Sequence, residues 1–129
     1  MNNFVRQKLL EWRGSPLLFA TEALGVVPSE QQAQALSSFL SSKRHTIRSG
    51  HGTGKDAFAS WIILWFLSCF TYPKIMCTAP TARQLSDILW AELSKWLRKS
   101  ILADEFVIQS DKIFHKDAPK EWWARAVTA

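Results

Sequence analysis

A cluster of glycines is the part of this sequence whose residue types and spacing point most directly to chemistry. It reads Ser49-Gly50-His51-Gly52-Thr53-Gly54-Lys55-Asp56. Glycines let the backbone bend until successive amide N–H groups surround phosphate oxygens, and the dipole of a following helix favours the same negative charge. Lys55 adds a cation for the terminal phosphates. The cluster therefore predicts a phosphate-binding loop; the alternative is a glycine-rich turn with a solvated lysine.

Two positions of this loop differ from the strict pattern GxxxxGK followed by Ser or Thr. Ser49 replaces the first glycine, and Asp56 replaces the residue whose hydroxyl ligates Mg²⁺. A carboxylate is itself a magnesium ligand, but it also places negative charge beside the phosphates. We therefore expect Ser49 to be tolerated, and we take Asp56 as the candidate magnesium ligand and as a substitution that lowers any catalytic rate.

A strand must precede such a loop and a helix must follow it. Residues 44–48 include the β-branched pair Thr46 and Ile47 and predict a short strand. Residues 55–70 are apolar on almost every side, which predicts a helix buried between other elements. Residues 74–79 then predict a second buried strand.

The rest of the chain supplies further helices and extended segments. Residues 81–100 predict one long helix, with core spacing at Leu85, Ile88, Leu89, Leu93, Trp96 and Leu97. Residues 106–114 and 122–127 predict two extended segments joined by a polar loop. The order strand, loop, helix, strand, helix predicts an α/β fold with a parallel sheet and crossover helices.

Three helices are predicted ahead of the loop. The first covers residues 4–12, the second residues 17–24 and the third residues 31–41. Ser15 and Pro16 are typical of a helix start and Gly25 of a helix end. The α/β part of the chain is therefore expected to follow an N-terminal helical segment.

Composition fits one globular domain and does not select a partner. The chain has 129 residues, 47% of them hydrophobic, and a net charge of +5, which suits an anionic partner as well as many soluble proteins. Seven Trp and eight Phe are more typical of a large core than of base stacking. Cys69 and Cys77 lie in apolar runs without metal-ligand spacing, which indicates reduced core thiols of a cytosolic protein and no zinc. The residues 57–70 are too few to span a bilayer, and no signal peptide is visible.

From the glycine loop onward the sequence resembles the ATPase domain of the large terminase subunit of tailed bacteriophages. The resemblance rests on SGHGTGKD, on the tryptophan-rich helix after it and on CTAPTARQLSDILWAEL. It implies a P-loop NTPase fold with a Walker A loop, ATP and Mg²⁺ as cofactors, and a motor that pumps double-stranded DNA into capsids in the host cell cytoplasm. The implied partners are double-stranded DNA, the small terminase subunit, the portal protein and other large-subunit copies, with no membrane.

The resemblance also assigns candidate residues outside the loop's glycines. Such motors hold adenine with a glutamine ahead of the loop, and Gln32 occupies that place, with Gln31 where tryptophan is usual. The alternative for Gln32 is an exposed helix residue. Some terminases place an arginine in the loop to stabilise charge on the transferring phosphate; His51 holds that position and acts only when protonated. Arg48, just ahead of the loop, is the second candidate for this catalytic role.

A further motif of the family follows the second strand. Thr78-Ala79-Pro80-Thr81 is similar to a segment that approaches DNA or couples to the nucleotide site in terminases and related helicases. A threonine at a helix start is also a common N-cap, and capping alone accounts for Thr81.

Hydrolysis in this family needs an apolar strand that ends in Asp-Glu. Asp104 and Glu105 imitate that ending, but they sit at the tail of a predicted helix, so we expect the true motif beyond residue 129. Residues 1–42 are then a helical segment with the adenine-side motif, and residues 43–129 the first part of a P-loop ATPase domain that stops before the Asp-Glu strand. The full-length protein would be an ATPase and nuclease, whereas we expect the isolated chain to bind ATP without hydrolysing it.

Two other functions remain open on the sequence. The loop and the Ala-Pro-Thr motif also occur in helicase-like ATPases, of which this chain would be a fragment. The chain would otherwise be a non-catalytic module derived from a terminase that docks its N-terminal helices on a partner, such as the small terminase subunit or a host sensor protein. In each case an incomplete sheet predicts that several large side chains of the helix at 55–70 stay uncovered.

Overall fold

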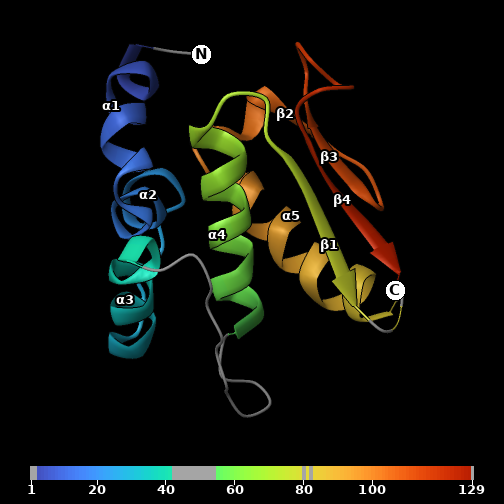
Figure 1. Ribbon diagram of the computed structural model, residues 1–129, viewed down its shortest axis with the longest axis horizontal. Helices are drawn as coiled ribbons and strands as arrows, with labels where there is room; N and C mark the ends of the chain where they lie inside the picture. The colour runs from blue at the N-terminus through green and yellow to red at the C-terminus, as the bar shows by residue number, and fades with distance from the viewer. Residues whose placement is uncertain (1–2, 42–54, 80, 82, 129) are drawn as a thin grey trace.

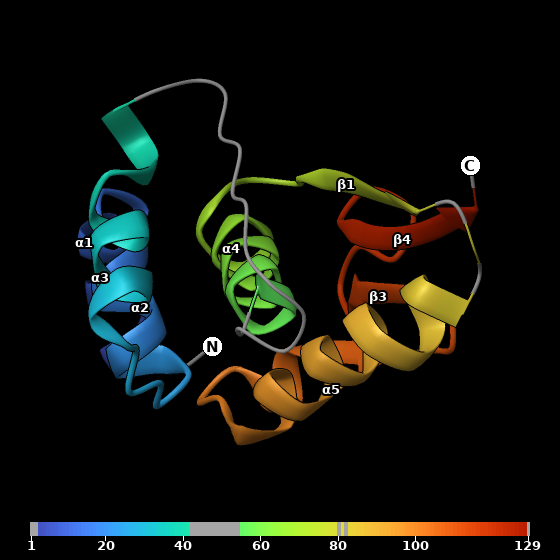
Figure 2. The ribbon, with the colours of Figure 1, turned by 90° about the horizontal axis from the view of Figure 1, so that it is seen from below.

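In the described part of the chain, helices form two layers on one side of a four-stranded sheet (Figures 1 and 2). The computed structural model describes residues 3–41, 55–79, 81 and 83–128. The outer layer consists of α1 (Asn3–Arg13), α2 (Pro16–Ala23) and α3 (Glu30–Ser37). The inner layer consists of α4 (Lys55–Cys69) and α5 (Trp90–Lys99), and α4 lies between the outer helices and the sheet.

The sheet is mixed, with strand order β1-β4-β3-β2. Its strands are β1 (Lys74–Ala79), β2 (Phe106–Ile108), β3 (Lys112–His115) and β4 (Trp123–Thr128). β1 and β4 are parallel, whereas β3 is antiparallel to both β4 and β2. The expected α/β fold with N-terminal helices is confirmed, but the expectation of a parallel sheet is wrong for β2 and β3. The strand predicted at residues 44–48 lies outside the described residues.

The hairpin of β2 and β3 explains this difference. Residues 106–114 were expected to form one extended segment, but the chain reverses at Gln109, Ser110 and Asp111. The backbone N–H of Gln109 donates to the carbonyl oxygen of Lys112 at 2.7 Å. Serine and aspartate favour turns because their side chains compete for backbone hydrogen bonds. A local turn therefore produces an antiparallel pair of strands where one extended segment was expected.

The predicted starts and ends of the N-terminal helices are largely confirmed. Ser15 caps α2, because its Oγ accepts from the N–H of Leu18 at 3.1 Å, and Pro16 occupies the first turn. Gly25 follows with φ +72°, a conformation that favours glycine. The third helix is shorter than expected: α3 ends at Ser37, and a 3₁₀ turn, η1 (Phe39–Ser41), follows.

The long helix expected at residues 81–100 runs without a break from residue 83 to residue 99, but its pitch changes along its length. Gln84–Leu89 (η2) adopts π-helical turns and α5 begins only at Trp90. Leu93 and Leu97 are buried as predicted, but Ile88 is 41% exposed. A π-turn holds more residues than an α-turn, which rotates the preceding side chains away from the α-helical stripe. The assignment of Ile88 to the core is therefore wrong.

α4 is buried from both sides. Trp61 packs edge-on against Trp96 of α5 at 5.6 Å, and Trp65 packs against Phe39 of η1 at 5.9 Å. Among the large apolar side chains between residues 58 and 67, Phe66 alone is exposed, at 40%. The expectation of several uncovered side chains on this helix is therefore wrong for the described surface. No helix in the described ranges has the length and apolarity to cross a bilayer, α4 included.

Both cysteine thiols are expected to react slowly in the folded protein. Burial raises the pKa of Cys69 to about 12, against the opposing effect of Arg13, and it raises the pKa of Cys77 to about 11, both from 9.0. The thiolate is the reactive form, so at pH 8 each native thiol should react with an aromatic disulfide reagent at least about a hundredfold more slowly than in denaturant. Equal rates in native and denaturing buffer would contradict the burial of these residues.

Candidate phosphate-binding site

The N-terminal end of α4 is where the sequence places the phosphate-binding loop. Arg48 and residues 49–54, which include His51, lie outside the described residues. The backbone of Lys55 is described as the first residue of α4, and Asp56 follows in its first turn with a half-buried side chain. The first N–H groups of a helix have no partner within the helix, and its dipole is positive at this end. The end of α4 therefore has the polarity that an anion requires.

The ends of the parallel strands lie on the same side of the molecule as this helix end. α4 and β1 run in opposite directions, so the N-terminal end of α4 and the C-terminal ends of β1 and β4 all point to the lower side in Figure 1. Ligands of open α/β sheets bind at the carboxyl ends of the strands. Thr78 is exposed near that end of β1, and Thr81 is exposed just beyond it. The start of α4 and the carboxyl end of β1 thus lie on one side of the fold.

Gln32 has a local structural role that the sequence analysis did not assign to it. Its backbone N–H donates to Oγ of Ser29 at 3.2 Å, and its Oε1 accepts from the backbone N–H of Ser29 at 2.9 Å. This reciprocal pair is a capping box that starts α3, and the spacing Ser-x-x-Gln is its sequence signal. Gln32 is half-buried, so it is not simply an exposed helix residue. Its contact with adenine stays a prediction.

Asp104 and Glu105 do not end an apolar strand. They belong to a 3₁₀ turn, η3 (Ala103–Glu105), that leads into β2. Oε2 of Glu105 lies 3.3 Å from Nε2 of His115, which is buried and stacked on Trp122 at 3.9 Å. This position agrees with the expectation that the pair is not the Asp-Glu motif of a motor. His115 carries no signal in the sequence, because only the hairpin register, which pairs Phe106 with His115, brings it to Glu105.

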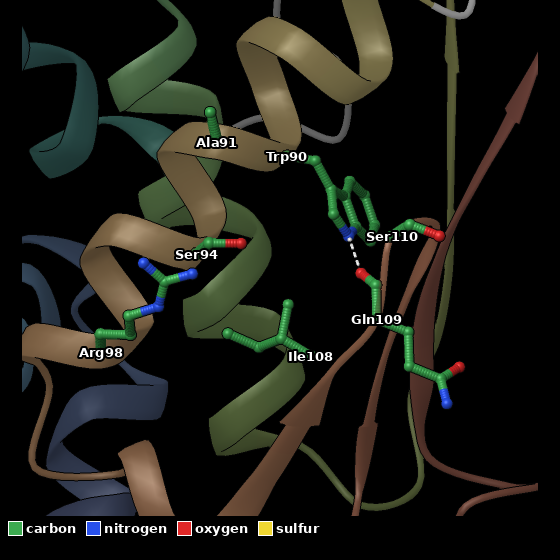
Figure 3. Close-up of a pocket in the computed structure, with 7 residues that line it drawn as sticks. All are labelled: Trp90, Ala91, Ser94, Arg98, Ile108, Gln109 and Ser110. Carbon is green, nitrogen blue, oxygen red and sulfur yellow. Dashed lines mark hydrogen bonds between the residues drawn. The ribbon is translucent and has the colours of Figure 1, made fainter.

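A hollow of about 510 Å³ opens between α5 and the turn after β2 (Figure 3). Its walls include Ser94 and Arg98 of α5 and Ile108 of β2. The indole N–H of Trp90 donates to the carbonyl oxygen of Gln109 at 3.0 Å and joins the two walls. The hollow has one guanidinium and no carboxylate in its lining, so it does not offer an acid–base pair for catalysis.

No described His, Cys, Asp and Glu side chains gather in threes as a metal site would require. A magnesium ion carried by nucleotide phosphates needs only one or two protein carboxylates, so this finding does not bear on the role of Asp56. Comparison with models of protein families, with curated proteins and with solved structures finds no match. The terminase resemblance therefore remains a prediction from the motifs.

Proposed function

We propose that this chain binds the phosphates of ATP at the N-terminal end of α4 and is the ATP-binding part of a motor that moves double-stranded DNA into a phage capsid. The observation that carries the proposal is the position of Lys55 at the start of a 15-residue helix, directly after the glycine cluster. A helix start supplies unpaired N–H groups and a favourable dipole, and the lysine adds a full charge. The motor and its partners rest on the terminase resemblance.

The surrounding fold supports the same location. α4 leads directly into β1, whose carboxyl end returns to the side where α4 begins. A helix followed by a strand of opposite direction is one half of the strand–helix–strand unit that nucleotide-binding α/β folds use. The P-loop arrangement of the sheet, with a strand at residues 44–48, is part of the proposal.

Asp56 is the protein group proposed to hold Mg²⁺. It lies in the first turn of α4, next to Lys55, and its half-buried side chain belongs to the end of the helix where phosphate is proposed to bind. Magnesium keeps several waters and binds through substrate phosphates with one or two carboxylates, so a single aspartate is a sufficient protein ligand. When bound, the ion neutralises phosphate charge.

Replacing Lys55 by alanine is the experiment that tests this proposal. A charge-assisted hydrogen bond contributes about 1.5–3 kcal/mol, so Lys55→Ala should weaken the binding of magnesium-ATP by about tenfold to a hundredfold in isothermal titration calorimetry. The melting temperature of each protein without nucleotide separates a loss of binding from a loss of folding.

Lys116→Ala is the matched control, because Lys116 is an exposed lysine in the loop after β3. This variant should bind nucleotide as the wild type does. Wild-type affinity in Lys55→Ala, or equal losses in both variants, would show that the end of α4 is not the phosphate site.

A further inference from the structure

The second face of the sheet carries no described element. α4, α5 and the outer helices all lie on one side of the strands (Figure 2). Ile75, Cys77, Ile113 and Ala124 point to that covered side and belong to the core. Because side chains alternate along a strand, their neighbours Lys74, Met76, Lys112, Phe114, Trp123 and Arg125 point to the other side. These six residues are called the open sheet face.

The strand register arranges the open sheet face in two rows. Lys74 of β1 pairs with Trp123 of β4, which pairs with Phe114 of β3. In the second row Met76 pairs with Arg125, which pairs with Lys112. Registered partners on neighbouring strands have their Cα atoms about 5 Å apart and their side chains on the same face. A row with two aromatic rings therefore lies directly beside a row with two cations.

The charges of this face are all positive. Nζ of Lys112 lies 5.5 Å from the ring centroid of Phe114, and Cζ of Arg125 lies 5.2 Å from that of Trp123. The six residues include three cations and no carboxylate. The nearest acidic residues along β3 and β4, Asp111 and Glu121, precede the strands. With one cation each on β1, β3 and β4, this part of the face is complementary to an anion.

The apolar part of this face is also unusual for an outer sheet surface. A sheet with one solvated face normally places polar side chains there. Here Met76 is 62% exposed, while Phe114 and Trp123 are half-buried beneath the cationic side chains. The indole N–H of Trp123 donates to the carbonyl oxygen of Lys120 at 3.1 Å, which fixes the ring. Aromatic rings beside cations suit a ligand that carries both planar groups and negative charge.

We propose that the open sheet face binds single-stranded nucleic acid. Bases stack on Phe114 and Trp123, and phosphates contact Lys74, Lys112 and Arg125. Aromatic side chains on a sheet and a basic track for the backbone are the two elements of single-strand binding. The bases of a duplex are stacked on one another inside the helix, so they are not available to stack on the rings of Phe114 and Trp123. This surface is separate from the N-terminal end of α4, so the inference does not depend on the proposed nucleotide site.

The test uses a labelled oligothymidine of about 20 nucleotides and fluorescence anisotropy at low salt. The wild-type protein should bind it, and unlabelled single strand should compete better than duplex of the same length. Removing one stacked base contact costs about tenfold or more in affinity, so Trp123→Leu should bind at least about tenfold more weakly. Trp123→Phe keeps a ring and should retain most of the affinity.

A charge-matched pair of double variants locates the site. Lys112→Gln with Arg125→Gln removes two cations from the open sheet face, whereas Lys95→Gln with Lys99→Gln removes two exposed cations from α5 on the covered side. The first pair should reduce the slope of log affinity against log salt by about 1.4, at roughly 0.7 per phosphate contact, and the second should leave it unchanged.

Three results would overturn the proposal. They are no binding by the wild type, equal competition by duplex, and equal losses in the two double variants. The last result would mean that the net positive charge of the protein alone attracts the oligonucleotide. If Trp123→Leu does not fold, the two double charge variants still test the proposal, because their substitutions lie on the surface and leave the core unchanged.

Discussion

Replacing Trp12 by alanine is expected to lower the free energy of unfolding by about 3–5 kcal/mol. The side chain is 0% exposed and packs edge-on against Phe19 at 5.6 Å. Its indole N–H donates to Oε1 of Glu22 at 2.9 Å, which joins α1 to α2. Alanine would leave a large cavity and remove the indole hydrogen bond to Glu22 between the two helices. Against a total stability of about 5–15 kcal/mol for a domain, this loss is a large fraction.

Urea denaturation followed by circular dichroism measures the loss of stability. Two further variants serve as comparisons, one that keeps a ring at position 12 and one at an exposed position of α1. Trp12→Phe keeps a ring in the cavity and should cost clearly less than alanine. Leu10→Ala, at a 75% exposed position of the same helix, should change stability by less than about 0.5 kcal/mol. A cost for Trp12→Ala as small as that of Leu10→Ala would mean that α1 does not dock as described.

The Trp12 hydrogen bond also gives this contact a pH dependence. The bond lowers the pKa of Glu22 from its ordinary value of 4.5, with a smaller contribution from Lys8 and against the effect of burial. A carboxyl whose folded pKa is lowered stabilises the fold above its unfolded pKa, and the contribution is lost as pH falls through the folded pKa. The free energy of unfolding of the wild type should therefore lose this contribution as pH falls below about 4.5. Trp12→Phe lacks the hydrogen bond, so its free energy of unfolding should fall less over the same pH range.

Local sequence signals were sufficient for most elements. The Ser15 cap, Pro16 and Gly25 bound α2 closely, because each acts through the backbone of its own turn. The apolar run at α4 and the β-type run at β1 were equally clear as a helix and a strand. The expectation that β1 is buried is wrong for one of its faces, where Lys74, Met76 and Thr78 are exposed. Fold class follows from the order of such segments, which is why the α/β prediction was correct.

The errors arose where long-range pairing or a small change of helical pitch decides the structure. The sequence of residues 106–114 does not indicate that β2 and β3 pair with each other, because a three-residue turn needs only common polar residues. A π-turn leaves the apolar spacing of Leu89 and Leu93 intact while it turns Ile88 outward. Hydrophobic periodicity is insensitive to both events.

The candidate phosphate site was predicted from residue types alone, and the structure adds its setting. The sequence identified the helix that Lys55 begins, but not that the carboxyl ends of β1 and β4 lie on the same side. Glu105 and His115 could not be paired from the sequence, since their contact depends on the register of the hairpin. The open sheet face was missed for the same reason: Trp123 and Phe114 become neighbours only once β3 and β4 are paired.

The C-terminal end of α4 provides the second large expected effect. The last carbonyl groups of a helix have no partner within it, and two of those at this end of α4 belong to buried residues. Nε of Arg13 donates to the carbonyl oxygen of Cys69 at 2.9 Å, and the indole N–H of Trp122 donates to that of Leu67 at 2.6 Å. Cys69 and Leu67 are both buried, so water is a poor substitute for these donors. Two distant segments, α1 and the start of β4, thus complete one helix end.

Removing both donors should therefore destabilise the fold by about 2–6 kcal/mol, because each buried acceptor left without a donor costs about 1–3 kcal/mol. Arg13→Met keeps the aliphatic stem that packs near Phe70, and Trp122→Phe keeps a ring against His115, so packing changes little. Trp96→Phe is the control for the loss of an indole donor, since its partner is the side chain of Glu92, which water can reach, and it should cost less than about 1.5 kcal/mol. Chemical denaturation of the double variant and of Trp96→Phe gives the comparison. If the double variant is no less stable than Trp96→Phe, the carbonyl groups at the end of α4 have other donors. The two hydrogen bonds from Arg13 and Trp122 then contribute little to the stability of the fold.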